Sequence, residues 1–97
     1  MRATGHFDME VPGNSTVKAD KEFPLEIGET VAINAVYSPQ TASVDFGLLA
    51  PDGLFYSLNA TDGSFDEVIA VDQRGNYTLV VRNSSDYSIN VSGYVNY

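Results

Sequence analysis

The sequence predicts an all-β fold, an antiparallel two-sheet sandwich of seven or eight strands that is immunoglobulin-like or jelly-roll-like. Apolar and polar residues alternate with a period of two along most of the chain, as in strands with one buried face. No long segment shows the i, i+3, i+4 apolar spacing of an amphipathic helix. Turn-forming residues recur about every 8–12 residues, which is typical of sandwiches. The Cys pair and the Trp of a true immunoglobulin domain are missing.

The N-terminal part of the chain contains three predicted strands. The first covers residues 6–11 and ends at the Pro12-Gly13-Asn14 turn. The second covers residues 23–27, and Pro24 indicates an edge strand because proline cannot donate to a β-ladder. The third covers residues 31–37. The side chains expected on the core-facing parity are those of Phe7, Met9, Val11, Phe23, Leu25, Ile27, Val31, Ile33, Ala35 and Tyr37.

Five further strands are predicted, over residues 43–50, 54–58, 65–71, 77–82 and 87–97. The strand over 43–50 is apolar on both parities, which predicts a central strand with both faces covered. The Pro51-Asp52-Gly53 turn joins it to a hairpin partner. Tyr77, Leu79 and Val81 are expected to face the core from an inner strand. The last strand has one apolar and one polar face. Its predicted inward parity comprises Tyr87, Ile89, Val91, Gly93, Val95 and Tyr97.

Composition limits the partners of this chain. The formal net charge is −8, and residues 22–72 contain nine acidic residues but no Lys or Arg. Such a surface repels phosphate backbones and anionic lipids, so we expect neither nucleic-acid binding nor direct membrane insertion. No apolar run is long enough to span a bilayer. Acidity also favours solubility, and we expect the isolated domain to be monomeric.

The length of 97 residues predicts a single domain over residues 1–97. The first residues lack the apolar segment of a signal peptide. We therefore expect the domain to be excised from a larger exported or membrane-anchored protein whose export signal lies outside it. The absence of cysteine excludes disulfides and thiolate chemistry.

Two blocks of the sequence resemble known modules. Ala42–Gly53 and then Gly75–Asn83 form a strand-turn-strand pattern, and the second block resembles the G-x-Y-x-(apolar)-x-V-x-N strand of bacterial pre-peptidase C-terminal domains. The span 23–97 is also similar to terminal modules of Gram-positive surface proteins, some of which are attached to BlaR-type antirepressor membrane metallopeptidases. The resemblance implies a non-catalytic, extracytoplasmic accessory domain. This chain lacks a clear acidic calcium signature, and the resemblance assigns no functional residue.

The residues that could carry catalysis are few. His6 is the only histidine, and a lone histidine without cysteine or an H-E-x-x-H motif does not make a zinc site. There is no G-x-S-x-G elbow for a nucleophile. We expect no enzyme activity and no cofactor, and we interpret His6 as an exposed polar residue.

Two sets of residues are candidate binding sites. Asp62, Ser64 and Asp66 place oxygen atoms at alternate positions and are calcium candidates, although their spacing is not that of an EF-hand and turn chemistry also explains Asp-Gly-Ser. Phe55 and Tyr94 lie on the off-core parity of their strands, so we expect them to be exposed and available for ligand stacking. Asn-x-Ser/Thr sequons occur five times, at Asn14, Asn59, Asn76, Asn83 and Asn90, and we interpret these asparagines as turn formers.

The sequence therefore predicts a non-catalytic extracytoplasmic accessory module at the cell surface or outside the cell. Its partner would be another protein or the remainder of its own parent chain. Two alternatives stay open: a glycan- or cell-wall-binding module, and a calcium-stabilised spacer domain.

Overall fold

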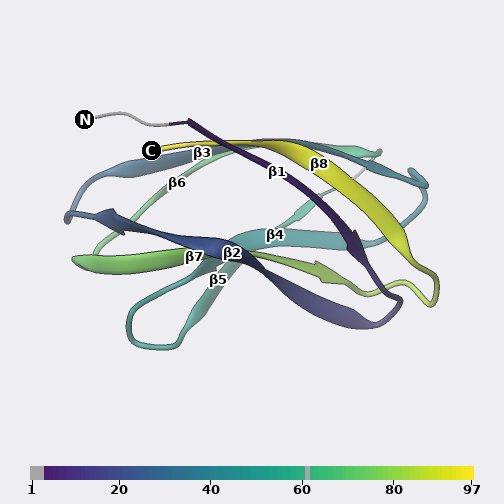
Figure 1. The fold of residues 1–97 in the computed structure, drawn as a ribbon, viewed down its shortest axis with the longest axis horizontal. Coiled ribbons are helices and arrows are strands. Elements are labelled where there is room, and N and C mark those ends of the chain that lie inside the picture. The colour runs from purple at the N-terminus through teal and green to yellow at the C-terminus, as the bar shows by residue number, and fades with distance from the viewer. Residues whose placement is uncertain (1–3, 61) are drawn as a thin grey trace.

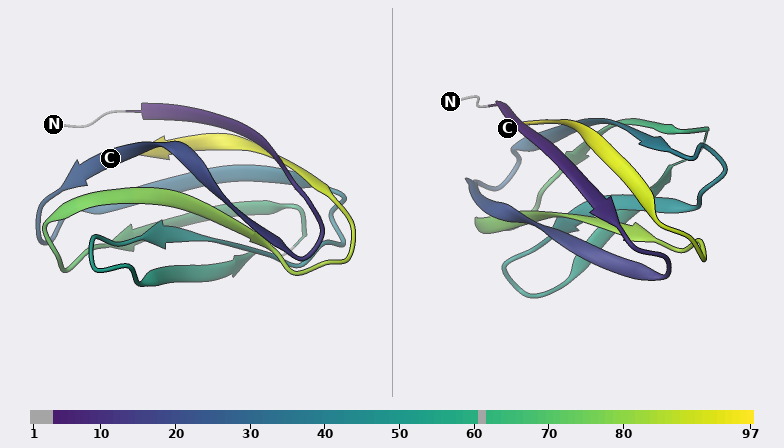
Figure 2. Two further views of the ribbon diagram at one scale, coloured as in Figure 1. Left: turned by 60° about the horizontal axis from the view of Figure 1, so that its bottom comes forward. Right: turned by 45° about the vertical axis from the view of Figure 1, so that its right-hand side comes forward.

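A computed structural model describes residues 4–60 and 62–97, the side chains of residues 20 and 21 excepted. Eight strands lie within these residues and form two layers, shown in Figure 1 and from two further directions in Figure 2. Within the same residues, no helix is long and apolar enough to cross a membrane. The strands are β1 (Thr4–Val11), β2 (Ser15–Leu25), β3 (Thr30–Ser38), β4 (Val44–Leu49), β5 (Phe55–Ala60), β6 (Ser64–Ala70), β7 (Gly75–Asn83) and β8 (Ile89–Asn96).

The strand order distinguishes between the two predicted sandwich types. One antiparallel sheet has the order β1-β8-β3-β6 and the other β2-β7-β4-β5. Consecutive strands share a sheet only at β4–β5, so every other connection in the described chain crosses between the layers. An immunoglobulin fold keeps several consecutive strands in one sheet, whereas crossing connections between two four-stranded sheets make a jelly roll. The all-β sandwich prediction is confirmed, and its topology is that of a jelly roll.

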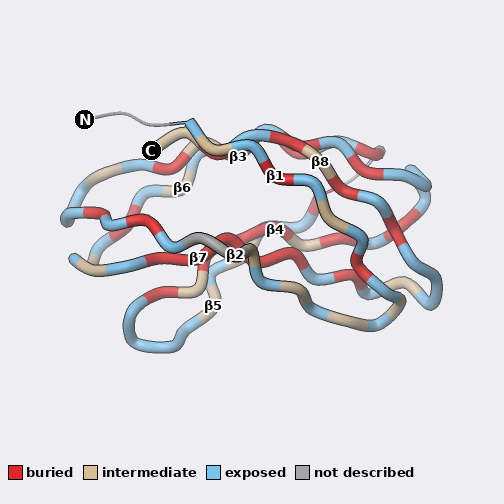
Figure 3. Tube along the Cα trace, viewed as in Figure 1, coloured by how far each residue is buried: buried red, intermediate tan, exposed pale blue. Residues whose placement is uncertain are grey.

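Three predictions about individual strands are confirmed. β4 is an inner strand of its sheet and is largely covered on both faces. β2 is an edge strand, and Pro24 lies in it. In β7, the side chains of Tyr77, Leu79 and Val81 are almost fully buried between the layers. Figure 3 shows β4 and β7 as mostly buried strands, whereas buried and more exposed positions alternate along β8.

Two predicted core positions, Ile27 and Tyr87, are instead exposed, and two others, Met9 and Tyr97, are only half-buried. Ile27 lies in the turn after β2, and Tyr87 lies in the loop before β8. Neither residue is paired in a sheet, so strand geometry does not direct its side chain toward the core. Tyr56 and Leu58 have the inward parity of β5, opposite Leu48 and Phe46. Both remain exposed because β5 is the outermost strand of its sheet, where the facing layer covers it less.

The edge strand β2 contains a bulge. Lys18 pairs with Val80 and Glu22 pairs with Thr78, so three residues of β2 lie opposite the single residue Leu79. Two extra residues displace the strand without reversing its parity, since side chains alternate with a period of two. Phe23 therefore still faces the core.

Val81 tests the assignment of the inner face of β7. Its side chain has no exposed surface, so Val81→Ala is expected to lower the free energy of unfolding by roughly 1–3 kcal/mol through lost burial and a cavity. Urea unfolding followed by circular dichroism measures this. Val68→Ala is the matched control, because Val68 is 61% exposed and its truncation should change stability by less than about 0.5 kcal/mol. Equal effects of the two substitutions would contradict the assignment.

Tyr77 links stability to alkaline pH. Its hydroxyl donates a 2.7 Å hydrogen bond to the Gln73 carbonyl, and burial raises the pKa of Tyr77 above its ordinary 10.0. The phenolate therefore forms more easily in the unfolded chain, so the stability from Tyr77 is complete below pH 10.0 and is lost as the pH rises further. Tyr77→Phe should remove the part of the alkaline decrease in stability that comes from Tyr77. At neutral pH it should lower the free energy of unfolding by about 1 kcal/mol, because the hydrogen bond to Gln73 is lost. An unchanged pH dependence in urea titrations of Tyr77→Phe would contradict the expectation.

Candidate interaction face

The outer face of the β1-β8-β3-β6 sheet is the candidate site. The register aligns His6, Tyr94, Asn34 and Asp66 in one row across all four strands. A neighbouring row contains Asp8, Ser92, Val36 and Ser64, and the row on the other side contains Thr4, Asn96, Ala32 and Val68. We call the surface formed by these three rows the amide face, because Asn34 lies at its centre.

Exposed apolar side chains surround Asn34. Tyr94 of β8 is 52% exposed, Val36 of β3 is 58% exposed and Val68 of β6 is 61% exposed. The ring centroids of Tyr94 and His6 lie 5.1 Å apart in an edge-to-face arrangement. Because an aromatic pair of this geometry restrains both rings, Tyr94 presents a partly fixed aromatic surface to solvent. The exposure predicted for Tyr94 and for His6 is confirmed.

Acidic side chains flank this apolar centre. Asp8 and Glu10 project from the edge strand β1, and Asp66 projects from the opposite edge strand β6. The four described strands of this sheet contain no Lys or Arg. The outer face of the other sheet carries the basic residues Lys18 and Arg82 beside the acidic residues Glu22 and Asp45. The two outer faces of the sandwich therefore differ in charge, and the amide face has the acidic character.

A shallow hollow of about 470 Å³ adjoins the amide face where β3 and β8 meet the turn before β6. Its lining includes side chains that bear carboxylate, amide and hydroxyl groups: Asp8, Gln40, Asp62, Ser64, Asn90 and Ser92. Such a lining offers hydrogen-bond acceptors and donors, and no basic side chain is among the residues that line it.

The structure places the three calcium candidates in this region. Asp62 lies in the turn before β6 with a backbone φ of 61°, and Ser64 and Asp66 project from β6 on the same face. The Cα atoms of Ser64 and Asp66, two positions apart on one face of the strand, are about 6.6 Å apart. In residues 4–60 and 62–97, no three His, Cys, Asp or Glu side chains are grouped so that they could hold a metal ion.

Phe55 is placed differently from Tyr94. It belongs to the other sheet, so the two rings lie on opposite outer faces and cannot form one stacking platform. Phe55 is half-buried, and the Arg82 guanidinium lies 5.3 Å from its ring centroid. Arg82 also makes hydrogen bonds of 3.0 and 2.7 Å to Asp45. The ring of Phe55 is thus engaged within the protein, and Tyr94 is the better candidate for an external ligand.

Sequence reasoning missed Asn34, Val36 and Val68 as members of a site. The off-core parity of Asn34 and Val36 is visible in the sequence, because both alternate with buried residues of β3. Val68 lacks this signal, since its neighbours in β6 are exposed Glu67 and half-buried Ile69. The proximity of all three residues to Tyr94 is not visible, since it depends on β8 lying between β1 and β3 in the sheet. The signal available in the sequence was an apolar residue, Val36, on the solvent-facing parity of its strand, where polar residues are usual.

The fold and this face together define an acidic jelly-roll sandwich with exposed apolar side chains on one sheet face. No family model and no curated protein sequence matches the chain. Among solved structures, it is similar to PliG of Aeromonas hydrophila, a periplasmic lysozyme inhibitor of g-type lysozyme. That match has 16% identity and a TM-score of 0.63, and covers 95% of this chain and 83% of PliG.

A second similar structure is the VP2 subviral particle of infectious bursal disease virus. Here the identity is 15% and the TM-score 0.54, and the match covers 99% of this chain but only 31% of VP2. At these identities the two likenesses show the fold alone. The resemblance to pre-peptidase C-terminal and BlaR-associated modules stays a prediction.

Proposed function

We propose that the chain is a non-catalytic accessory module of a larger exported protein, and that it binds a protein partner or the rest of its parent chain through the amide face. The observation that carries this proposal is the group formed by Tyr94, Val36 and Val68, exposed around Asn34 on one sheet face. Protein interfaces commonly centre on such an aromatic anchor and surround it with a polar rim.

The charge distribution suggests the chemistry of the partner surface. Acidic side chains at the rim of the amide face attract Lys and Arg on a partner and increase the rate of association. The extracytoplasmic location rests on the resemblance of Gly75–Asn83 to strands of secreted accessory domains. PliG, which shares the fold, is described as periplasmic and as an inhibitor of another protein. This is a likeness of fold and supports the proposal only by analogy.

Site-specific photo-crosslinking in cells that express the parent protein tests the proposal. A benzophenone amino acid at position 94 should yield a discrete crosslinked product with another protein or with a distant part of the parent chain. The same group at Thr16, exposed on the outer face of the other sheet, is the matched control. No product from position 94, or the same products from both positions, would contradict the proposal.

Once the crosslinked partner is known, Tyr94→Ala should weaken its binding. Central aromatic residues of interfaces commonly contribute about 2 kcal/mol or more, which corresponds to about a 30-fold loss of affinity. Stability should change little, because Tyr94 is exposed and not part of the core. Thr16→Ala should bind normally in the same calorimetric titration. Equal affinity of the wild type and Tyr94→Ala would remove Tyr94 from the proposed interface.

Glycan binding is the second candidate function, because an exposed aromatic ring beside amide groups also suits a sugar. In the amide face, Tyr94 pairs with Asn34 on the adjacent strand. Titration with soluble cell-wall fragments, followed by amide NMR shifts, distinguishes the two functions. Shifts confined to the rows around Tyr94 would favour the glycan, and their absence would exclude it.

A further inference from the structure

The second concave feature of the molecule lies at the edge where β1 faces β2. These strands belong to different sheets, so the space between them is bridged by side chains and not by a β-ladder. We call this space the edge slot. The side chains that define it are Phe7, Met9, Val17, Phe23, Leu79 and Tyr97.

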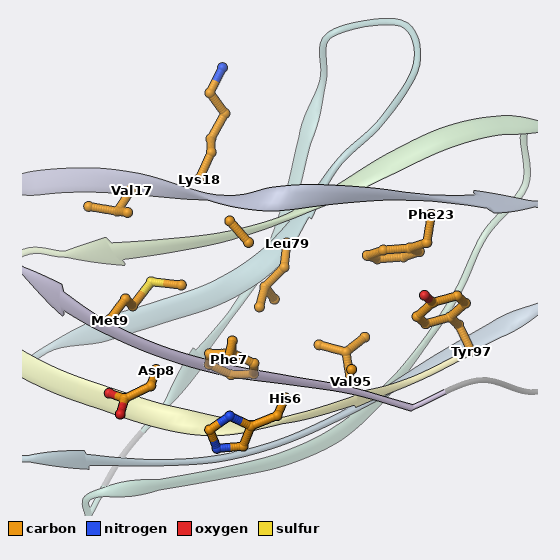
Figure 4. A pocket seen from close by; sticks show the side chains of 12 residues that line it. His6, Phe7, Asp8, Met9, Val17, Lys18, Phe23, Leu79, Val95 and Tyr97 are labelled. Carbon is orange, nitrogen blue, oxygen red and sulfur yellow. The ribbon is translucent and has the colours of Figure 1, made fainter.

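The edge slot is elongated, and its lining combines apolar side chains with the polar residues His6, Asp8 and Lys18. Figure 4 shows Met9 and Val17 at one end, Phe23 and Tyr97 at the other, and Leu79 between them. Gly5 and Met9 of β1 both line the slot, which gives it a length of about 13 Å at about 3.3 Å per residue. The charged groups of Lys18 and Asp8 are directed away from it in the same view.

The apolar lining is incompletely covered by the protein itself. Met9, Val17, Ala19 and Tyr97 pack against the core but remain partly exposed. Ala19 is the first residue of the β2 bulge opposite Leu79, and its small side chain leaves space where a larger one would meet the facing layer. The slot that Ala19 lines has a volume of about 320 Å³.

We propose that the edge slot binds one unbranched alkyl chain of a free single-chain amphiphile. A volume of about 320 Å³ is at the lower end for small-molecule pockets and is too small for a helix, whose diameter is about 10 Å. Apolar cavities hold water poorly and accept apolar ligands. The slot is elongated and partly open to solvent, so the chain lies inside while its polar head remains in solvent.

Titration with octanoate, decanoate and dodecanoate tests the proposal by calorimetry and methyl NMR. Each methylene that enters the slot should tighten binding about fourfold, until the slot is full and the gain stops. The methyl signals of Met9, Val17 and Leu79 should shift together. Nonyl maltoside, with the same nine-carbon alkyl chain and an uncharged head, should compete with decanoate. Affinity that is independent of chain length would overturn the proposal.

Slot-filling variants provide the structural control. Ala19→Phe should occupy the slot and weaken decanoate binding by about tenfold or more, because the ligand and the new ring compete for one space. Val17→Phe serves the same purpose should Ala19→Phe fail to fold. Thr16→Phe, which places the same ring on the outer face, should bind decanoate normally. Undiminished binding by a folded slot-filling variant would locate the ligand elsewhere and refute the proposal.

A separate sedimentation experiment distinguishes a free amphiphile from a membrane lipid as the source of the bound alkyl chain. Phosphatidylcholine vesicles are sedimented with the protein, and the proposal expects the protein to remain in the supernatant while free decanoate still binds. Sedimentation with the vesicles, without binding of free decanoate, would show that the slot inserts into a lipid surface and would overturn the assignment to a free amphiphile.

Discussion

Gly93→Ala is expected to lower the free energy of unfolding by about 4 kcal/mol, which would leave a domain of this size close to unfolding. Gly93 lies in β8 between Phe7 of β1 and Ala35 of β3. A Cβ atom on Gly93 would collide with the Asn34 carbonyl oxygen and would lie 2.7 Å from the Ala35 Cα. Both are backbone atoms, so no rotamer change relieves the overlap, and β3 would have to move away from β8.

Gly5→Ala is the matched control for this prediction. Gly5 also lies in the β1-β8-β3-β6 sheet, but a Cβ there would meet no atom within 4 Å. Its replacement should leave stability unchanged or raise it by less than about 1 kcal/mol, because alanine restricts the unfolded chain. Urea unfolding of both variants measures the difference. A Gly93→Ala variant as stable as Gly5→Ala would show that β3 and β8 do not approach each other as the structure has them.

The same close approach matters for the candidate interaction face. The carbonyl that excludes a side chain at position 93 belongs to Asn34, which lies at the centre of the amide face. Tyr94 is the next residue along β8 and projects to that face. Gly93 therefore helps to set the spacing between Tyr94 and Asn34, and a core-side substitution could alter the face without touching its side chains.

The fold class could be predicted from the sequence because a buried face produces alternation within each strand. β7 and β8 were located in this way, whereas β4 was located as a run that is apolar on both parities; the inward residues of all three are buried as expected. Alternation does not reveal which strands are neighbours. The distinction between immunoglobulin and jelly-roll topology, and the exposure of Tyr56 and Leu58 on the edge strand β5, depend on that missing information.

The candidate site was less predictable than the fold for the same physical reason. Tyr94 could be chosen from its parity alone. Val36 and Val68 could be assigned to the site only from the strand register, which places them around Asn34, the cross-strand neighbour of Tyr94. Phe55 has the same off-core parity as Tyr94, yet Arg82 lies over its ring. The edge slot depends on the β2 bulge, and residues 15–21 show too little apolar alternation for the sequence to predict the strand that contains it.

Asn83 carries the second large expected effect. Its predicted role was that of a turn residue, but its side chain is almost fully buried at the end of β7. The Nδ2 group donates to the carbonyls of Val11 and Pro12, both at 3.2 Å, and of Tyr87 at 2.7 Å. Its Oδ1 accepts from the Ser85 backbone N–H at 2.9 Å. One side chain thus joins the β1–β2 turn to the β7–β8 loop.

Asn83→Ala should therefore lower the free energy of unfolding by about 3 kcal/mol. It leaves the Ser85 N–H and the three carbonyls without their hydrogen-bond partner. Asn83→Asp keeps the acceptor but loses both amide protons, and it places a carboxylate beside three carbonyl oxygens. The carbonyls raise the pKa of such a buried acid, so the stability of this variant should fall as the pH rises through that pKa and recover in acid. Asn90→Ala, at an exposed sequon, should change stability by less than about 0.5 kcal/mol. If Asn83→Ala unfolds in urea at the same midpoint as Asn90→Ala, the buried amide does not hold the two loops together.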